Sequence, residues 1–76
     1  MDKYIEFLTN YIAEMNDIDK EGIDINSDIF QNSYIDSIGI FSLLVEIEDK
    51  FGKTLALDDI ASLDKYTLYN IAKLME

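Results

Sequence analysis

Apolar side chains recur along this chain at intervals of three and four residues, the spacing of an amphipathic α-helix, and nowhere alternate as they do in a β-strand. The segment nearest the N-terminus carries one such stripe, widened by aromatic residues. Its members are Ile5, Leu8, Ile12 and Met15, with Tyr4, Phe7 and Tyr11. We therefore predict a first helix over residues 2–16.

The segment 37–51 has more apolar residues than one core-facing stripe requires. The stripe itself consists of Ile40, Leu43, Leu44, Ile47 and Phe51. A second set lies on a neighbouring face of the same helix and consists of Ile38, Phe41, Val45 and Glu48. We predict a helix over residues 37–51, ended by Gly52, whose second face is covered by something other than the core.

Two further helices are predicted after a loop over residues 53–57. A short one spans 58–62, and Asp64 or Thr67 can cap the last one. The apolar positions of the last helix are Leu68, Ile71, Ala72 and Met75. The sequence thus predicts an all-α fold, a small four-helix bundle of three main helices and one short helix, in a single domain over residues 1–76.

Residues 17–36 form a long first loop without periodicity. A connection of this length is uncommon in a compact domain unless it is functional or disordered. Apolar residues are spread along it: Ile18, Ile23, Ile25, Ile29, Phe30 and Ile35. We expect these side chains to plug into the core and keep the loop ordered.

Composition restricts the possible functions. The 76 residues include no Cys and no His, so a thiolate nucleophile, the commonest general base and the commonest metal ligand are missing, and we expect no catalysis and no metal site. Sixteen acidic residues against six basic ones give a net charge of −10, which argues against nucleic acid and anionic membranes. With no membrane-spanning segment and no apolar secretory signal, we expect a cytoplasmic monomer.

One hydroxyl stands out at the junction between the long loop and the helix 37–51. The stretch Tyr34-Ile35-Asp36-Ser37-Ile38 places Ser37 at a helix N-terminus, where unpaired backbone N–H groups and the helix dipole favour an attached phosphate. The simpler interpretation is that Asp36 or Ser37 only caps the helix. Both interpretations fit these five residues taken alone.

The stretch Asp36-Ser37-Ile38, followed by residues 43–51 (LLVEIEDKF), resembles the acyl carrier proteins. The likeness extends to length, acidity, the long first loop and the helix order, and the family motif Asp-Ser-Leu has Ile38 in place of its Leu. The resemblance implies that a phosphopantetheinyl transferase attaches 4′-phosphopantetheine from coenzyme A to Ser37. The terminal thiol of that group then carries acyl chains as thioesters, as in fatty acid biosynthesis and lipid metabolism.

The resemblance also implies a docking surface beside Ser37. Its partners are the transferase, loading ligases and acyl-transferring enzymes, each with a basic patch around an apolar groove. The expected docking residues are Asp36, Ile38, Phe41, Val45, Glu48 and Asp49. The alternative is that the apolar members belong to the core and the acidic members merely solvate a helix.

The cargo is left open by the sequence. Gly39 and Ser42 stand where fatty-acid-type carriers usually have acidic residues, and the run 29–39 also resembles D-alanyl and other aminoacyl carrier proteins. A fatty chain would need a cavity inside the bundle, for example beside Ile40, Leu44, Ile47 and Leu68, which are also expected core residues. An alternative of another class is an unmodified acidic helical adaptor that binds a protein partner through the second face of the helix 37–51.

Overall fold

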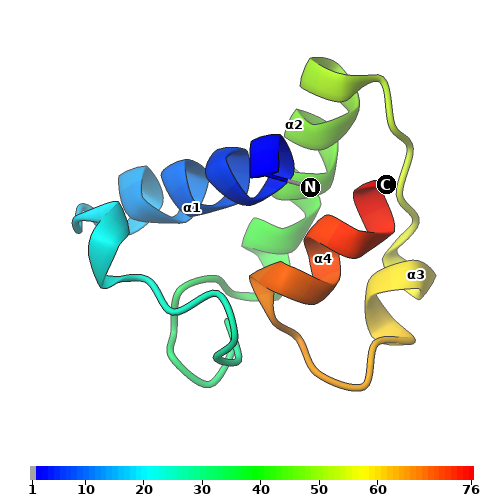
Figure 1. Ribbon diagram of the computed structural model, residues 1–76. Helices are drawn as coiled ribbons and strands as arrows, with labels where there is room; N and C mark the ends of the chain where they lie inside the picture. Colours follow the sequence, from blue (N-terminus) through cyan, green and yellow to red (C-terminus); the bar gives the residue numbers. More distant parts are fainter. Residues whose placement is uncertain (1) are drawn as a thin grey trace.

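A computed structural model describes residues 2–76, with Ser37 described by its backbone alone. Its elements are α1 (Asp2–Asn16), a 3₁₀ turn η1 (Lys20–Gly22), α2 (Ser37–Phe51), α3 (Leu57–Ala61) and α4 (Leu68–Met75), arranged as in Figure 1. Over residues 2–76 the chain forms no strand, only an isolated bridge between Asp28 and Thr67. The predicted all-α fold of three main helices and one short helix is confirmed.

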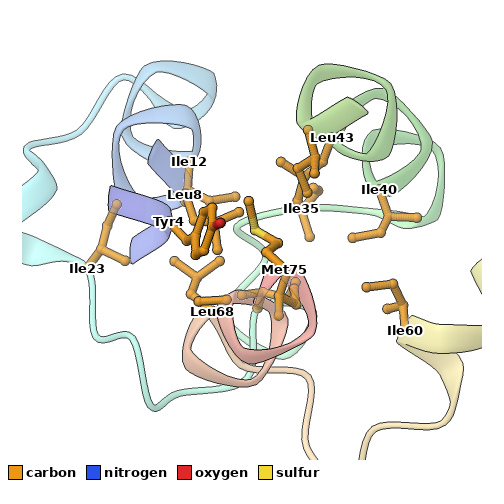
Figure 2. Close-up of a cluster of buried hydrophobic side chains, with 14 of the residues drawn as sticks. Tyr4, Leu8, Ile12, Ile23, Ile35, Ile40, Leu43, Ile60, Leu68 and Met75 are labelled. Carbon is orange, nitrogen blue, oxygen red and sulfur yellow. The ribbon is translucent and has the colours of Figure 1, made fainter. Parts of the chain in front are cut away.

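One hydrophobic core joins the four helices. Figure 2 shows side chains of α1, α2 and α4 converging on a common centre, with Ile60 of α3 facing Ile40 of α2 at one side. The innermost side chains are Leu8, Ile12, Ile29, Leu43, Ile47, Leu68, Ile71 and Met75. The stripes read from the 3.6-residue period therefore meet in one place, and their burial is the main favourable contribution to folding.

Two hydrogen bonds anchor the second half of the first loop to the rest of the molecule, one near residue 29 and one near residue 34. The Ile29 N–H donates to the Tyr66 carbonyl at 2.9 Å, and the Asn16 side chain donates to the Tyr34 carbonyl at 2.8 Å. Ile23, Ile29 and Ile35 are buried. The expected ordered loop is confirmed for these plugs, and the segment before α2 is held by hydrogen bonds as well as by packing.

Two apolar residues predicted to face the core do not. Met15 and Ile18 are 44% and 42% exposed. A helix of 15 residues is about 22 Å long, while the whole molecule measures 27 × 23 × 22 Å. The last turn of α1 therefore reaches the surface, and the Asn16 side chain, not Met15, makes the bond to the loop there.

The helix ends follow local chemistry, with one shift. Gly52 ends α2 in the left-handed region at φ 67°, and the Thr67 hydroxyl caps α4 by accepting from the Asn70 N–H at 3.1 Å. The short helix α3 begins at Leu57, one residue before the predicted start, because the Asp59 carboxylate reaches back to the Ala56 N–H at 2.9 Å. Asp59 thus stabilises a helix start, as expected for an acid in a first turn.

Candidate functional site

The N-terminus of α2 is capped by Asp36. Its backbone is extended at φ −107° and ψ −179°, its carboxylate accepts from the Gly39 N–H at 2.6 Å, and its carbonyl accepts from the Ile40 N–H at 3.1 Å. Ser37 follows as the first residue of the 15-residue helix. Of the two residues that can cap α2 by sequence, Asp36 is the one that does. The Ser37 side chain itself lies outside what the structure describes.

Gly39 has a packing role that was not expected from the sequence. A Cβ at this position would lie 2.8 Å from Cγ1 of Ile35 and 3.1 Å from the Asp36 carboxylate. Ile35 is buried, and its side chain lies against Gly39 in the first turn of α2. The absence of a side chain at Gly39 therefore lets the loop close onto the helix, and an acidic side chain at this position would displace Ile35.

A second face of α2 is exposed, as its apolar excess predicts. Ile38, Phe41 and Val45 are 77%, 53% and 65% exposed, so they are not core residues. Glu48 and Asp49 are exposed on the same side. We call Ile38, Phe41, Val45, Glu48 and Asp49 the exposed α2 face. Helical spacing brings five of the six predicted docking residues onto it, and Asp36 lies just before its first turn.

A hollow of about 330 Å³ opens between α2, α3 and the first loop. The Phe30 ring meets the Tyr66 ring edge-on with centroids 5.4 Å apart, and Phe41 connects the hollow to the exposed α2 face. The lining residues of this α2–α3 hollow are Phe30, Ile40, Phe41, Leu57, Ile60, Ala61 and Tyr66. Its walls are almost entirely apolar, so it suits an apolar group better than a charged one.

The α2–α3 hollow contains only one of the four residues considered for a cavity inside the bundle. Ile40 borders it, whereas Ile47 and Leu68 are fully buried in the core and Leu44 is half-buried. Leu57 and Tyr66 were missed because single apolar residues in short or irregular segments have no period. The only signal in the sequence was that Leu57, an apolar residue, precedes the Asp58-Asp59 pair. Such a residue does not by itself indicate the wall of a hollow.

The described part of the chain has neither a cluster of metal ligands nor a membrane-spanning helix. Within residues 2–76 no group of three or more acidic side chains converges as metal ligands would. Over the same residues no helix combines the length and apolarity needed to cross a membrane. Exposed acids lie towards both ends of α2: Asp36 directly before Ser37, and Glu48 and Asp49 about three turns further along the helix.

Comparison with known proteins identifies one family. The family model described as "Phosphopantetheine attachment site" matches residues 6–75, nearly the whole chain. No curated protein and no solved structure matches.

Proposed function

Since the chain belongs to the phosphopantetheine attachment site family, and is thus a carrier with covalently attached 4′-phosphopantetheine, we propose that the Ser37 hydroxyl bears this group. The supporting observation is the position of Ser37 directly after the cap of a 15-residue helix. There the helix dipole and unpaired first-turn N–H groups stabilise a phosphodiester. Asp36 uses the Gly39 N–H, which leaves the earlier N–H groups of the turn for the phosphate.

The surroundings of Ser37 fit a long flexible group. Asp36 and Ile38, its neighbours in the chain, are both exposed, and Ile38 is 77% exposed. The group supplies the terminal thiol that a chain without Cys lacks, and this thiol holds the cargo as a thioester. The residues of the chain position and present the group, and separate enzymes attach it and load it.

The experiment is intact-mass measurement after incubation with coenzyme A and a broad-specificity phosphopantetheinyl transferase. We expect the full chain to gain about 340 Da, the mass of the transferred group. Ser37→Ala should gain nothing, whereas Ser42→Ala, which changes an exposed serine of the same helix, should gain the full mass. A mass gain retained in Ser37→Ala would place the group on another residue, and no gain in the unaltered chain would favour an unmodified adaptor.

We further propose that the transferase and loading enzymes dock on Asp36 and the exposed α2 face. A basic partner with an apolar groove matches exposed Ile38, Phe41 and Val45 flanked by carboxylates. The net charge of −10 attracts such a partner over a distance and keeps copies of the chain apart, which supports a monomer.

For the cargo, we propose an apolar acyl chain ahead of an amino acid. The support is the α2–α3 hollow, whose apolar walls include Phe41, one turn along α2 from Ser37. An aminoacyl thioester carries an ammonium group, and moving it against these walls costs desolvation energy that no carboxylate in the hollow's lining offsets. An aminoacyl carrier is the alternative, and loading assays with fatty-acyl and amino-acid ligases separate the two.

A further inference from the structure

A second groove lies between α1 and the C-terminal half of α2. It encloses about 440 Å³, and its floor is aromatic. The Phe7 ring meets the Phe51 ring edge-on with centroids 5.2 Å apart, and Tyr11 lies beside Phe7 at 6.1 Å. The walls carry the charged and polar side chains of Lys3, Glu6, Asn10, Glu14, Glu46 and Lys50. We call this the α1–α2 groove.

The two ends of the groove differ in charge. At one end the Lys50 ammonium lies over the Phe7 ring at 5.6 Å, and Lys3 lies over Tyr4 at 5.1 Å. At the other end Glu14 and Glu46 flank Tyr11, and within residues 2–76 neither carboxylate has an ion-pair partner. Lys50 shows that a cation can lie on a ring of this aromatic floor, and Tyr11 between the two glutamates offers a similar setting without one.

The α1–α2 groove is separate from the exposed α2 face. Glu46 follows Phe41 by five residues, which places it roughly 140° away around the helix at 100° per residue. Glu46 therefore faces α1, while Phe41 faces the α2–α3 hollow. A protein bound in the groove does not cover the surface beside Ser37.

We propose that the α1–α2 groove is a second docking site, and that its occupant is an arginine side chain of a partner protein seated over Tyr11 between Glu14 and Glu46. A planar guanidinium stacks on an aromatic ring and donates to carboxylates on both sides, which a lysine ammonium does less well. Lys3 and Lys50 repel a second cation at the lysine end of the groove. They therefore fix which way round the partner binds along the groove.

Charge decides among the possible occupants. A second copy of this chain has a net charge of −10 and only six basic residues, so it is repelled. Nucleic acid and anionic membranes are repelled for the same reason. A protein with an arginine on an apolar surface complements the groove, and it can bind whether or not Ser37 is modified.

The test is an NMR titration of the full ¹⁵N-labelled chain with the blocked peptide acetyl-leucyl-arginyl-leucine amide. Its control is the same peptide with citrulline, which keeps the shape but loses the charge. We expect amide shifts confined to residues 7–14 and 46–51 with the arginine peptide and much smaller ones with citrulline. Raising the salt concentration should weaken binding.

Matched variants locate the contact. Glu14→Gln/Glu46→Gln should weaken binding about fivefold, the scale of two exposed charge contacts. Glu48→Gln/Asp49→Asn removes the same charge from the exposed α2 face and should leave binding unchanged. Equal binding of the citrulline peptide, equal loss in both variants, shifts centred on Ile38 and Phe41, or no shift at millimolar peptide would overturn the proposal. Ser37 modification, measured by mass on the same samples, fails or succeeds independently of these results.

Discussion

At the scale of single residues, Gly39 connects the first loop to the candidate site. The position tolerates no Cβ without movement, because Cγ1 of the buried Ile35 would lie 2.8 Å away. Cγ1 is close to the backbone and cannot swing aside as the end of a long side chain can. The packing of the first loop against α2 therefore requires a glycine at position 39. The same packing explains why no acidic residue occupies this position.

We predict that Gly39→Ala destabilises the protein by about 1 kcal/mol, because the overpacking cost exceeds the helix propensity gained near a helix start. Chemical denaturation monitored by circular dichroism measures this change. Ser42→Ala, at an exposed position of the same helix, should be neutral or stabilising. A Gly39→Ala variant as stable as the unaltered chain would show that Ile35 moves freely.

A second prediction at this scale concerns Tyr11. Partial burial, with a smaller contribution from the Glu46 carboxylate, raises the pKa of Tyr11 above its usual value of 10.0. Glu46→Gln should therefore lower the pKa of Tyr11 part of the way back, while Glu48→Gln should not, as measured by NMR titration of the ring. Because the pKa is higher in the folded state, the stability that Tyr11 contributes is complete below about pH 10 and is lost as pH rises through the folded pKa. A pKa of Tyr11 unchanged in Glu46→Gln would mean that burial alone causes the shift.

At the scale of elements, α2 contributes side chains to three environments: the hydrophobic core, the exposed α2 face and the α1–α2 groove. Leu43 and Ile47 are fully buried in the core, Val45 is exposed about two turns along the helix from Ser37, and Glu46 faces α1. The short helix α3 has a narrower role, since Ile60 packs against the core while Leu57 and Ala61 form one wall of the α2–α3 hollow. The position of α3 therefore decides what the hollow accepts.

We predict that octanoyl loading on the modified chain raises the free energy of unfolding by about 1–3 kcal/mol. The reason is that a few methylene groups move from water into the hollow, and each contributes about 0.8 kcal/mol. Leu57→Asp should abolish the gain. Ile18→Asp, at a position of similar exposure (42% against 43%) but outside the hollow, should keep it. Thermal unfolding of loaded and unloaded samples measures the difference. The same gain in the free energy of unfolding in both variants would mean that the octanoyl group lies outside the hollow.

At the scale of the whole molecule, charge is unevenly distributed. Three of the six lysines, Lys3, Lys50 and Lys53, lie over the rings of Tyr4 and Phe7 where α1 begins and α2 ends. The only charged residue within four positions of Ser37 on either side is Asp36. A basic partner is thus attracted by the net charge but repelled locally where Lys3, Lys50 and Lys53 gather.

We predict that Glu48→Lys/Asp49→Lys slows modification of Ser37 by about tenfold or more at low salt, because the transferase loses attraction at its docking surface. The difference should shrink as salt rises. Glu21→Lys/Asp64→Lys changes the net charge equally at exposed positions outside α2 and should slow the reaction much less. Initial rates by mass spectrometry compare the variants, and equal slowing by both would show that net charge alone matters.

The boundaries of α1 and α2 followed from the sequence because an amphipathic period and a cap act within a few residues. The predicted ranges 2–16 and 37–51 agree with Asp2–Asn16 and Ser37–Phe51. The exposure of Ile38, Phe41 and Val45 also followed, since α2 has more apolar surface than one core can bury. The exposure of Met15 and Ile18 did not, because it depends on where α1 passes the edge of the molecule.

By itself the sequence determined the all-α fold, the placement of Ser37 at the start of α2 and the acidity of the surface, because helical period, capping and net charge are properties of neighbouring residues or of composition. Only the tertiary structure decided that Asp36 is the cap, that Gly39 makes room for Ile35, and that Phe30, Leu57 and Tyr66 share a hollow. It alone also joined Tyr11 to Glu46 across the α1–α2 groove. The hollow and the groove depend on how segments distant in the chain pack, and the contacts at Asp36 and Gly39 depend on the backbone path by which the loop enters α2, so no local pattern of residue types contains them.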